Sequence, residues 1–355
     1  MPSHVPLEAA HRAAGAVIED VDGWMLPVRY GDVAAEHRAA RSGAGVADRS
    51  NVGKVVVTGR DRQSFLQGML SNDVKALGSG QGTSAAFLDA HGKVSALIDV
   101  TVLDDRLWLE LPPGLTDKTL QKLDHFLISE KAVFEAADES FAALAVEGPE
   151  ARALLEAAAG RALDLEPHAH VEASIGGAPV RVIRRSAIGG PGFQCWTMAL
   201  HAAPLWGALV SAGAKPIGAE ALEVLRVEAG IALYGRDVDE TVILPETRLE
   251  HVVSYNKGCY IGQEVVARVK YRGHVNRALS GLVLDGDRVP VAGATVLAED
   301  KEIGRVTSAV RSIALGRPIA LGYVRREHFA PGSPVTVRDG MGAIAARVVE
   351  LPFAA

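Results

Sequence analysis

The residues with the clearest chemical potential lie in one stretch, KGCYIGQEVVARVKYRG, residues 257–273. Its thiol, Cys259, follows Gly258, and the positive charge of Lys257 beside them would lower the pKa of that thiol. Gly258 and Gly262 permit a tight backbone path around the cysteine. This setting is typical of a reactive or metal-contacting thiolate.

Polar groups complete the motif around the thiol. Gln263 and Glu264 supply hydrogen-bonding groups, and Tyr260 lies next to the cysteine. The alternative for Cys259 is that of a small buried hydrophobe, which is the commoner role of a free cysteine. Cys195, within the apolar run FQCWTMAL, fits that alternative well.

A row of basic residues follows the cysteine. Arg268, Lys270, Arg272 and His274 alternate with apolar or small residues. In a strand, successive side chains point to opposite faces, so the spacing predicts one basic face that could hold a polyanion. An ordinary solvated strand face is the alternative.

Composition narrows the classes of protein. The chain has 355 residues, 48% of them hydrophobic and 23% charged, which favours two or three globular domains. A net charge of −6 gives no indication of nucleic acid or an anionic membrane as a main partner. Two isolated cysteines make neither a disulfide framework nor a four-ligand metal site, so we expect no tightly bound metal. Without a signal peptide or a long apolar segment, we expect a cytoplasmic protein.

The elements that must position the motif read as two α+β patterns in tandem. The first follows the order strand, helix, paired strands, helix, strand, which resembles the split βαβ pattern. It comprises residues 54–59, 60–73, 83–112, 115–128 and 131–137. A similar order begins at FAALAVEG and continues through residues 149–160, 178–186, 193–200 and 203–213.

From Ser280 onward, short β-prone runs separated by Gly, Pro and Asp predict a small β-barrel. The fold class is therefore α+β: tandem ferredoxin-like units followed by a C-terminal β-barrel. We expect boundaries at 1–278 and 279–355. Within the first region, the two subdomains are expected at about 50–138 and at 139–278 with the N-terminal segment.

The motif resembles the signature of the YgfZ family, the folate-binding iron-sulfur cluster maintenance proteins. Their pattern is LysGlyCysTyr, any residue, GlyGlnGlu, and residues 257–264 meet all its fixed positions. Residues 65–74, 92–100 and 225–250 resemble segments that this family shares with the glycine-cleavage aminomethyltransferases. The resemblance covers nearly the whole chain and implies tetrahydrofolate or a derivative as the cofactor.

The resemblance also implies folate contacts. Aminomethyltransferases have Glu after GlyPhe, where it binds the pterin ring, whereas this chain has Gln194. Arg226 and Glu228 align with residues lining the folate cavity, with an exposed helix pair as the alternative, and Tyr234 lies in the same shared segment. The basic row of Arg268, Lys270 and Arg272 would meet a folate polyglutamate tail.

An acid pair expected in the aminomethyltransferases is missing. Alignment on Gly92 places Ala96 and Leu97 at those positions, where neither side chain can ionise. Asp99, one strand period further on, would point to the same face as Leu97 and is the alternative carboxylate. A displacement of ~6–7 Å is large beside the hydrogen-bond reach that proton transfer requires, which disfavours it.

Three functions follow. The first is a tetrahydrofolate-binding factor, not itself an enzyme, that uses Cys259 with Lys257 as activator. It would support assembly or repair of iron-sulfur clusters in client enzymes, including tRNA-modifying ones. The alternative is a tetrahydrofolate-dependent aminomethyltransferase or related one-carbon transferase. An RNA-contacting module is the third, disfavoured because few aromatic side chains lie near the basic row.

Overall fold

The computed structural model describes residues 2–353. Contacts divide this chain into two compact units. The first unit contains the chain up to Leu66 together with Val74–Thr83 and Ile98–Glu223. The second unit contains Gln67–Asp73, Ser84–Leu97 and the chain from Val224 onward. Short segments early in the sequence therefore belong to the same unit as the cysteine motif.

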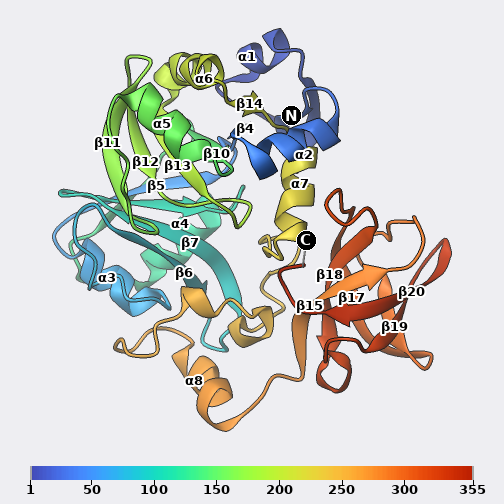
Figure 1. The fold of residues 1–355 in the computed structure, drawn as a ribbon. Helices are drawn as coiled ribbons and strands as arrows, with labels where there is room; N and C mark the ends of the chain where they lie inside the picture. Colours follow the sequence, from blue (N-terminus) through green and yellow to red (C-terminus); the bar gives the residue numbers. More distant parts are fainter. Residues whose placement is uncertain (1, 354–355) are drawn as a thin grey trace. The chain divides into compact units, whose positions relative to one another are not determined.

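The first α+β pattern forms a five-stranded sheet with the order β6-β7-β8-β5-β9 (Figure 1). Its strands are β5 (Gly53–Thr58), β6 (Gly82–Leu88), β7 (Val94–Val102), β8 (Leu107–Leu111) and β9 (Val133–Ala136). Its helices are α3 (Arg62–Met69) and α4 (Thr116–Phe126). The order β9-β5-β8-β7 is that of a split βαβ unit, with β6 added at the edge. The predicted ferredoxin-like pattern is confirmed.

The second pattern forms a six-stranded sheet with the order β11-β12-β13-β10-β4-β14. Its strands are β4 (Gly45–Asp48), β10 (Phe141–Glu147), β11 (His170–Ile175), β12 (Ala178–Ile183), β13 (Gly192–Met198) and β14 (Lys215–Pro216). Helices α5 (Ala151–Ala159) and α6 (Ala202–Ser211) connect them. The N-terminal segment supplies β4, which occupies the place beside β10 that the last strand of a split βαβ unit would take.

The remaining N-terminal elements form a small three-stranded sheet and two helices. They are β1 (Ser3–His4), α1 (Glu8–Ala13), β2 (Val17–Val21), β3 (Trp24–Arg29) and α2 (Val33–Ser42). Asp32 caps α2, because its side chain accepts a hydrogen bond from the backbone N–H of Ala34. His11 of α1 contacts Asp48 of β4 at 2.8 Å, which joins this segment to the six-stranded sheet.

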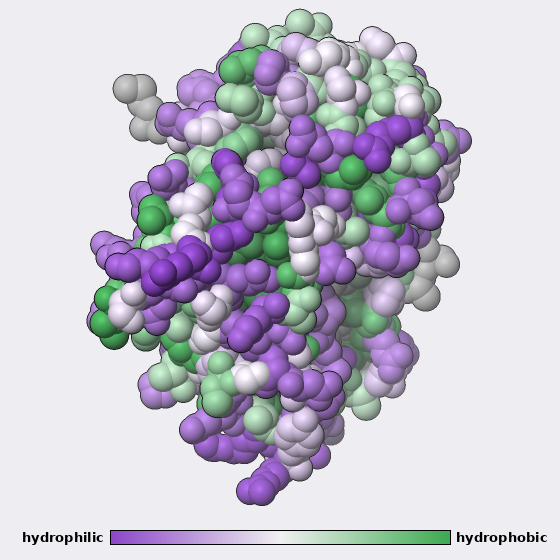
Figure 2. Space-filling view, turned by 90° about the vertical axis from the view of Figure 1, so that its left-hand side faces the viewer, coloured by the Kyte–Doolittle hydropathy of each residue, from purple (hydrophilic) through white to green (hydrophobic). Residues whose placement is uncertain are grey.

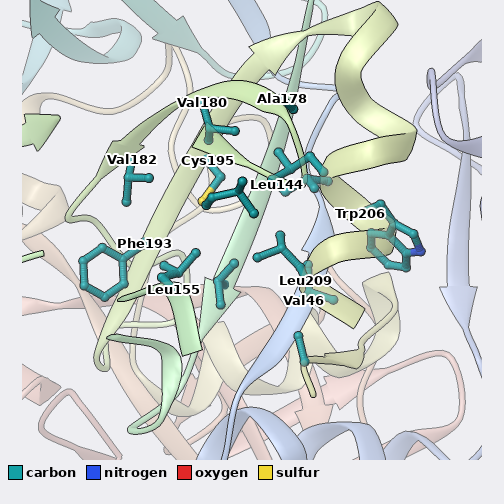
Figure 3. Close-up of a cluster of buried hydrophobic side chains, with 14 of the residues drawn as sticks. Val46, Leu144, Leu155, Ala178, Val180, Val182, Phe193, Cys195, Trp206 and Leu209 are labelled. Atoms are coloured by element: carbon teal, nitrogen blue, oxygen red, sulfur yellow. The ribbon is translucent and has the colours of Figure 1, made fainter. Parts of the chain in front are cut away.

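Strand alternation gives β10 and β13 two different faces. One face carries Leu144, Phe193 and Cys195, which lie in a buried hydrophobic cluster (Figure 3). Figure 3 shows the Cys195 sulfur among Leu144 and Val180, and burial raises the pKa of this thiol to about 12. Cys195 is therefore a packing residue, as its sequence context indicates. The opposite face, which we call the polar face, carries the polar side chains of Glu147 and Gln194 among apolar ones such as Ala143 and Trp196.

Six strands close the C-terminal barrel in the order β15-β18-β17-β16-β19-β20. They are β15 (Arg277–Leu284), β16 (Thr295–Ala298), β17 (Lys301–Arg311), β18 (Pro318–Arg325), β19 (Pro334–Asp339) and β20 (Gly342–Val349). A buried cluster that includes Leu282, Val296 and Val337 fills its interior. The predicted barrel is confirmed.

The predicted strand after Cys259 is wrong, because Gln263–Arg272 is helix α8. The segment contains Gln, Glu, Ala, Arg and Lys, which are good helix formers, and it has no internal glycine or proline. Gly262, with φ +80°, precedes the helix and Gly273 follows it. A spacing of two between basic residues did not reveal this, since it occurs in both kinds of element.

The remaining helices are short connecting elements. They are α7 (Ala219–Glu228), η1 (Ala199–His201), η2 (Leu244–Thr247), η3 (Glu250–Val252) and η4 (Arg326–His328). On the face in Figure 2, hydrophobic side chains lie scattered among hydrophilic ones. Within residues 2–353, no helix has the length and apolar character that crossing a membrane requires.

Candidate functional site

The cysteine motif in the second unit forms a closed turn before α8. The backbone N–H of Tyr260 donates to Oε1 of Gln263, and the backbone N–H of Gln263 donates to the carbonyl of Tyr260, each at 3.3 Å. This reciprocal pairing satisfies groups at the start of the helix that would otherwise lack partners. The Tyr–x–Gly–Gln part of the motif thus has a local structural explanation.

Gly262 is required by a close approach of two backbones. A Cβ at Gly262 would lie 2.4 Å from the carbonyl oxygen of Asp89, and the residue has φ +80°. A Cβ at Gly92, at the end of the same turn, would lie 2.8 Å from Cβ of Val265. The start of α8 therefore packs directly on the turn between β6 and β7, where a larger residue would not fit.

Lys257 fixes the loop that carries the thiol. Its Nζ donates to the carbonyl oxygens of Gln67 at 2.7 Å, Leu70 at 2.5 Å and Asn72 at 2.9 Å. It also lies 5.1 Å from the ring centre of Tyr260, a cation–π distance. All three ammonium N–H groups thus have acceptors, so Lys257 is an anchor. Its expected role as activator of Cys259 stays a prediction.

Cys259 is exposed, as are Gly258 and Glu264 beside it. The alternative of a buried packing cysteine is therefore wrong for this residue. Glu264 lies in the first turn of α8, where a negative charge is favourable near the helix N-terminus. The turn presents a thiol to solvent on a backbone held at several points, which is a suitable arrangement for reactivity.

Helix α8 separates the basic residues that were expected to share one face. Two residues along a helix correspond to about 200°, so Lys270 points away from Arg268 and Arg272. Lys270 Nζ lies 3.6 Å from a carboxylate oxygen of Glu250. Arg268 and Arg272 are exposed on one side, one turn apart, and His274 follows the helix. The expected single face shared by Arg268, Lys270 and Arg272 is therefore wrong, whereas a contact of these residues with a folate polyglutamate tail stays a prediction.

Arg226 and Glu228 are buried side chains that join α7 to the barrel. Arg226 Nη1 donates to Asp237 at 2.6 Å, and Nη2 donates to the hydroxyl of Ser308 at 2.6 Å. Oε1 of Glu228 accepts a hydrogen bond from the hydroxyl of Ser312 at 2.6 Å. The alternative of an exposed helix pair is wrong, since both are less than 9% exposed. These contacts are structural, and a role in folate binding stays a prediction.

Tyr234 contacts β7, the strand that carries Ala96 and Leu97. Its hydroxyl donates to the carbonyl of Ser95 at 2.7 Å. Burial raises the pKa of Tyr234, so it remains a neutral donor. Ala96 is fully buried and Leu97 packs against a hydrophobic cluster. These positions supply no ionisable side chain.

Gln194, in the first unit, has an acceptor without a partner. It lies on the polar face of β13 and is 1% exposed. Its Oε1 makes no hydrogen bond within the part of the chain that the structure describes. A buried acceptor left unpaired is unfavourable and unusual in proteins, so this oxygen calls for a donor.

Charged residues surround this face of the sheet. Glu110 of β8 accepts hydrogen bonds from Trp196 Nε1, at 3.3 Å, and from Arg185. Arg185 also lies 3.1 Å from Asp99, and Arg49 lies 3.6 Å from Glu110. We call the set the buried polar cluster; it comprises Arg49, Asp99, Glu110, Glu147, Arg185, Gln194 and Trp196.

Glu147 differs from the other acids of the cluster. It is fully buried, and its oxygens accept hydrogen bonds from the Ser186 hydroxyl at 2.6 Å and the Ala187 backbone N–H at 2.8 Å. Burial raises the pKa of Glu147 to about 7, against the lowering effect of these hydrogen bonds and of Arg49 and Arg185. The carboxyl can therefore gain or lose a proton near neutrality.

Gln194 and Asp99 are candidates from the sequence alone, whereas Glu147, Glu110 and Arg185 are not. The available signal was an acid within an otherwise apolar β-prone run, as in FAALAVEG and LWLELP. The sequence does not tell whether the side chain of such an acid points to solvent or toward the other sheet. Only the three-dimensional arrangement of the two sheets decides this. In residues 2–353, no three His, Cys, Asp or Glu side chains are grouped to hold a metal ion.

The cluster suits a pterin ring better than a purely apolar pocket would. A pterin has N–H donors on its amino group and ring, and the unpaired Gln194 Oε1 is an acceptor of the matching kind. The charged side chains of the cluster, of which Glu110 and Glu147 are buried and Arg49 and Asp99 partly exposed, provide further hydrogen-bonding groups. The hydrogen-bonding groups present therefore fit those of a pterin ring.

Comparison with known proteins identifies the family of both parts of the chain. Residues 7–257 match the family model of the GCVT N-terminal domain, and residues 277–354 match that of the glycine cleavage T-protein C-terminal barrel domain. An aminomethyltransferase of Streptomyces avermitilis is 33% identical, covering 99% of this chain and 97% of its own. One of Rubrobacter xylanophilus is 34% identical, covering 98% and 93%.

A solved structure is similar over its whole length. The crystal structure of glycine cleavage system aminomethyltransferase T from Bartonella henselae has a TM-score of 0.91 and 26% sequence identity. The match covers 100% of this chain and 98% of that one.

Proposed function

Because the chain belongs to the glycine cleavage T-protein family, we propose that it binds a reduced folate at the buried polar cluster and acts in one-carbon transfer. The aminomethyltransferase names of its relatives motivate the transfer step. The observation that carries the binding proposal is the buried, unpaired Oε1 of Gln194.

The roles of the cluster residues follow from their chemistry. A bound reduced folate supplies ring nitrogens that can hold a one-carbon unit. Gln194 Oε1 would accept an N–H of the pterin ring, and the ion pairs of Arg185 with Asp99 and Glu110 would keep these side chains in place. Glu147 would hold or release a proton near neutral pH.

Binding of 5-formyltetrahydrofolate, measured by isothermal titration calorimetry, tests the proposal. We expect the wild-type chain to bind and Gln194→Ala to bind at least about tenfold more weakly, from the loss of one buried hydrogen bond. Gln121→Ala, at an exposed position of α4, is the matched control. Equal affinity of all three chains would contradict the assigned site, and no binding by the wild type would contradict the function.

Transfer is tested separately from binding. A purified chain that converts tetrahydrofolate and an aminomethyl donor into methylenetetrahydrofolate, with release of the amino nitrogen as ammonia, is a transferase. Binding without product formation restricts the function to folate binding. The second outcome is compatible with Ala96 and Leu97, which carry no acid.

A second candidate function is iron-sulfur cluster maintenance, as in the YgfZ family, with client or assembly proteins as partners. The observation in its favour is Cys259, exposed on a turn held by Lys257 and Gly262. Cells lacking the homologous factor would receive the wild-type chain or Cys259→Ala. Restoration of a tRNA methylthiolase by the wild type alone would support this function. Equal restoration by the wild type and by Cys259→Ala would show that the thiol is not needed for this function. No restoration by either chain would contradict the function.

A further inference from the structure

Glu147 lies beside Gln194 on the polar face of the six-stranded sheet. Ala145 pairs with Gln194, and Glu147 pairs with Gly192, in the antiparallel register of β10 and β13. Because side chains alternate, Glu147 and Gln194 point to the same face and are diagonal neighbours. Gly192 has no side chain, and a Cβ there would lie 2.1 Å from Oε2 of Glu147. The carboxyl therefore lies directly over Gly192, next to the amide of Gln194, whose Oε1 is unpaired.

The cluster has no spare cation for Glu147. Arg185 pairs with Asp99 and Glu110, and Arg49 pairs with Glu110. Among residues 2–353, the Glu147 oxygens contact a hydroxyl and a backbone N–H but no cationic group within 4.0 Å. Each oxygen accepts one hydrogen bond and retains a second lone pair. A buried carboxyl in this state has capacity for further N–H donors.

We propose that the Glu147 carboxylate is the second acceptor for the N–H donors of the pterin ring, and that it supplies the negative charge that Gln194 lacks. This inference rests on the proposed folate function. A charged acceptor binds an amino group or a ring N–H more strongly than a neutral one. The charge lies on the neighbouring strand β10 instead of on β13.

A pH dependence follows from this geometry. Burial raises the pKa of Glu147 to about 7, and Arg49 and Arg185 are the cations that face it, with Glu110 and Asp99 as their partners. The ionised fraction rises from roughly one tenth at pH 6 to nine tenths at pH 8. If the carboxylate form binds, affinity should rise about tenfold over this range.

The experiment compares five chains by calorimetry with 5-formyltetrahydrofolate at pH 6 and pH 8. They are the wild type, Glu147→Gln, Gln194→Glu, the double variant Glu147→Gln with Gln194→Glu, and Glu139→Gln. Glu139 is exposed in the same unit and is the matched control. We expect Glu147→Gln to bind at least about tenfold more weakly at pH 8 and to lose the pH dependence. The double variant should return to within about threefold of the wild type at pH 8, because it restores one negative charge to the same face of the sheet, on β13 instead of on β10.

Each other outcome overturns the inference. Wild-type affinity and pH dependence in Glu147→Gln would make Glu147 only an anchor for Ser186 and Ala187. If Glu147→Gln binds folate more weakly and the double variant does not restore the affinity, Glu147 acts only by positioning Ser186 and Ala187. Thermal unfolding of each variant separates a binding defect from misfolding. If the wild type binds folate, either of these variant results leaves the proposed function intact. If the wild type does not bind folate, both the proposed function and the inference on Glu147 are overturned.

Discussion

The motif turn and the buried polar cluster differ in solvent exposure and in the contacts that hold them in place. The turn at residues 257–264 presents an exposed thiol, and backbone hydrogen bonds and a close glycine contact hold it in place. The cluster hides charged side chains between two sheets, and ion pairs hold it in place. A short motif can specify the first, because its contacts are local. The second arises only when strands distant in sequence meet, so its residues carry little local pattern.

The largest effect should come from breaking the ion pairs of the cluster. Arg185→Ala leaves Asp99 and Glu110 without their shared cation, and we expect a loss of about 3–5 kcal/mol in the free energy of unfolding. Arg38→Ala removes an exposed pair with Asp32 and should change it by less than about 1 kcal/mol. Urea unfolding measures both. Similar small losses would show that the cluster does not depend on its ion pairs.

The pH dependence of stability should identify Glu147. Burial raises its pKa from 4.5 to about 7, so the folded chain keeps a proton that the unfolded chain releases between these values. Stability therefore falls as pH rises through this window, by roughly 3.4 kcal/mol in total, of which about 2.5 kcal/mol is lost between pH 5 and pH 8. Glu147→Gln should lack this fall, whereas Glu139→Gln should retain it. Unfolding at pH 5 and pH 8 checks this, and parallel pH profiles for wild type and Glu147→Gln would contradict it.

Gly262→Ala tests the close contact that holds the motif turn. The new Cβ would meet the Asp89 carbonyl at 2.4 Å from a backbone at φ +80°, so we expect a loss of about 2–3 kcal/mol. Gly258→Ala is the control, because a Cβ there meets nothing within 4 Å. Chemical unfolding gives the two values. A Gly262→Ala chain as stable as the Gly258→Ala chain would mean that the turn can move away from Asp89.

Lys257→Met should loosen the same turn to a smaller extent. It removes three hydrogen bonds to backbone carbonyls while keeping a side chain of similar length, and we expect a loss of about 1–2 kcal/mol. The rate of Cys259 alkylation should rise as the loop becomes more mobile. Lys301→Met, at an exposed position, should leave both quantities unchanged. A slower alkylation rate with unchanged stability would instead support Lys257 as the activator of the thiol.

The smallest effect should be that of Cys259→Ser on stability. An exposed position should change the free energy of unfolding by less than about 0.5 kcal/mol. Cys195→Ser buries a hydroxyl among apolar side chains and should lose about 1–3 kcal/mol. Thiol titration should find one fast group in the native wild type and a second only on unfolding. Two fast thiols, or a large loss in Cys259→Ser, would contradict these environments.

Much of the fold was predictable because its strands and helices have clear periodicity. The split βαβ pattern and the barrel follow from alternating apolar runs and turn residues, and Cys195 follows from its apolar neighbours. Helix α8 was not predicted, since basic residues two apart fit a strand as well as an exposed helix face. The partners of Lys257 were also out of reach, because residues 67–72 are distant in sequence. The roles of Glu147 and Arg185 could not be predicted either, because they depend on how the two sheets pack in three dimensions.

The most direct measurement is a crystal structure of this chain with 5-formyltetrahydrofolate. We expect an N–H of the pterin ring to lie within hydrogen-bond distance of Gln194 Oε1, which is otherwise unpaired among the described residues. A folate bound away from Gln194, with its side chain satisfied by water alone, would contradict the account.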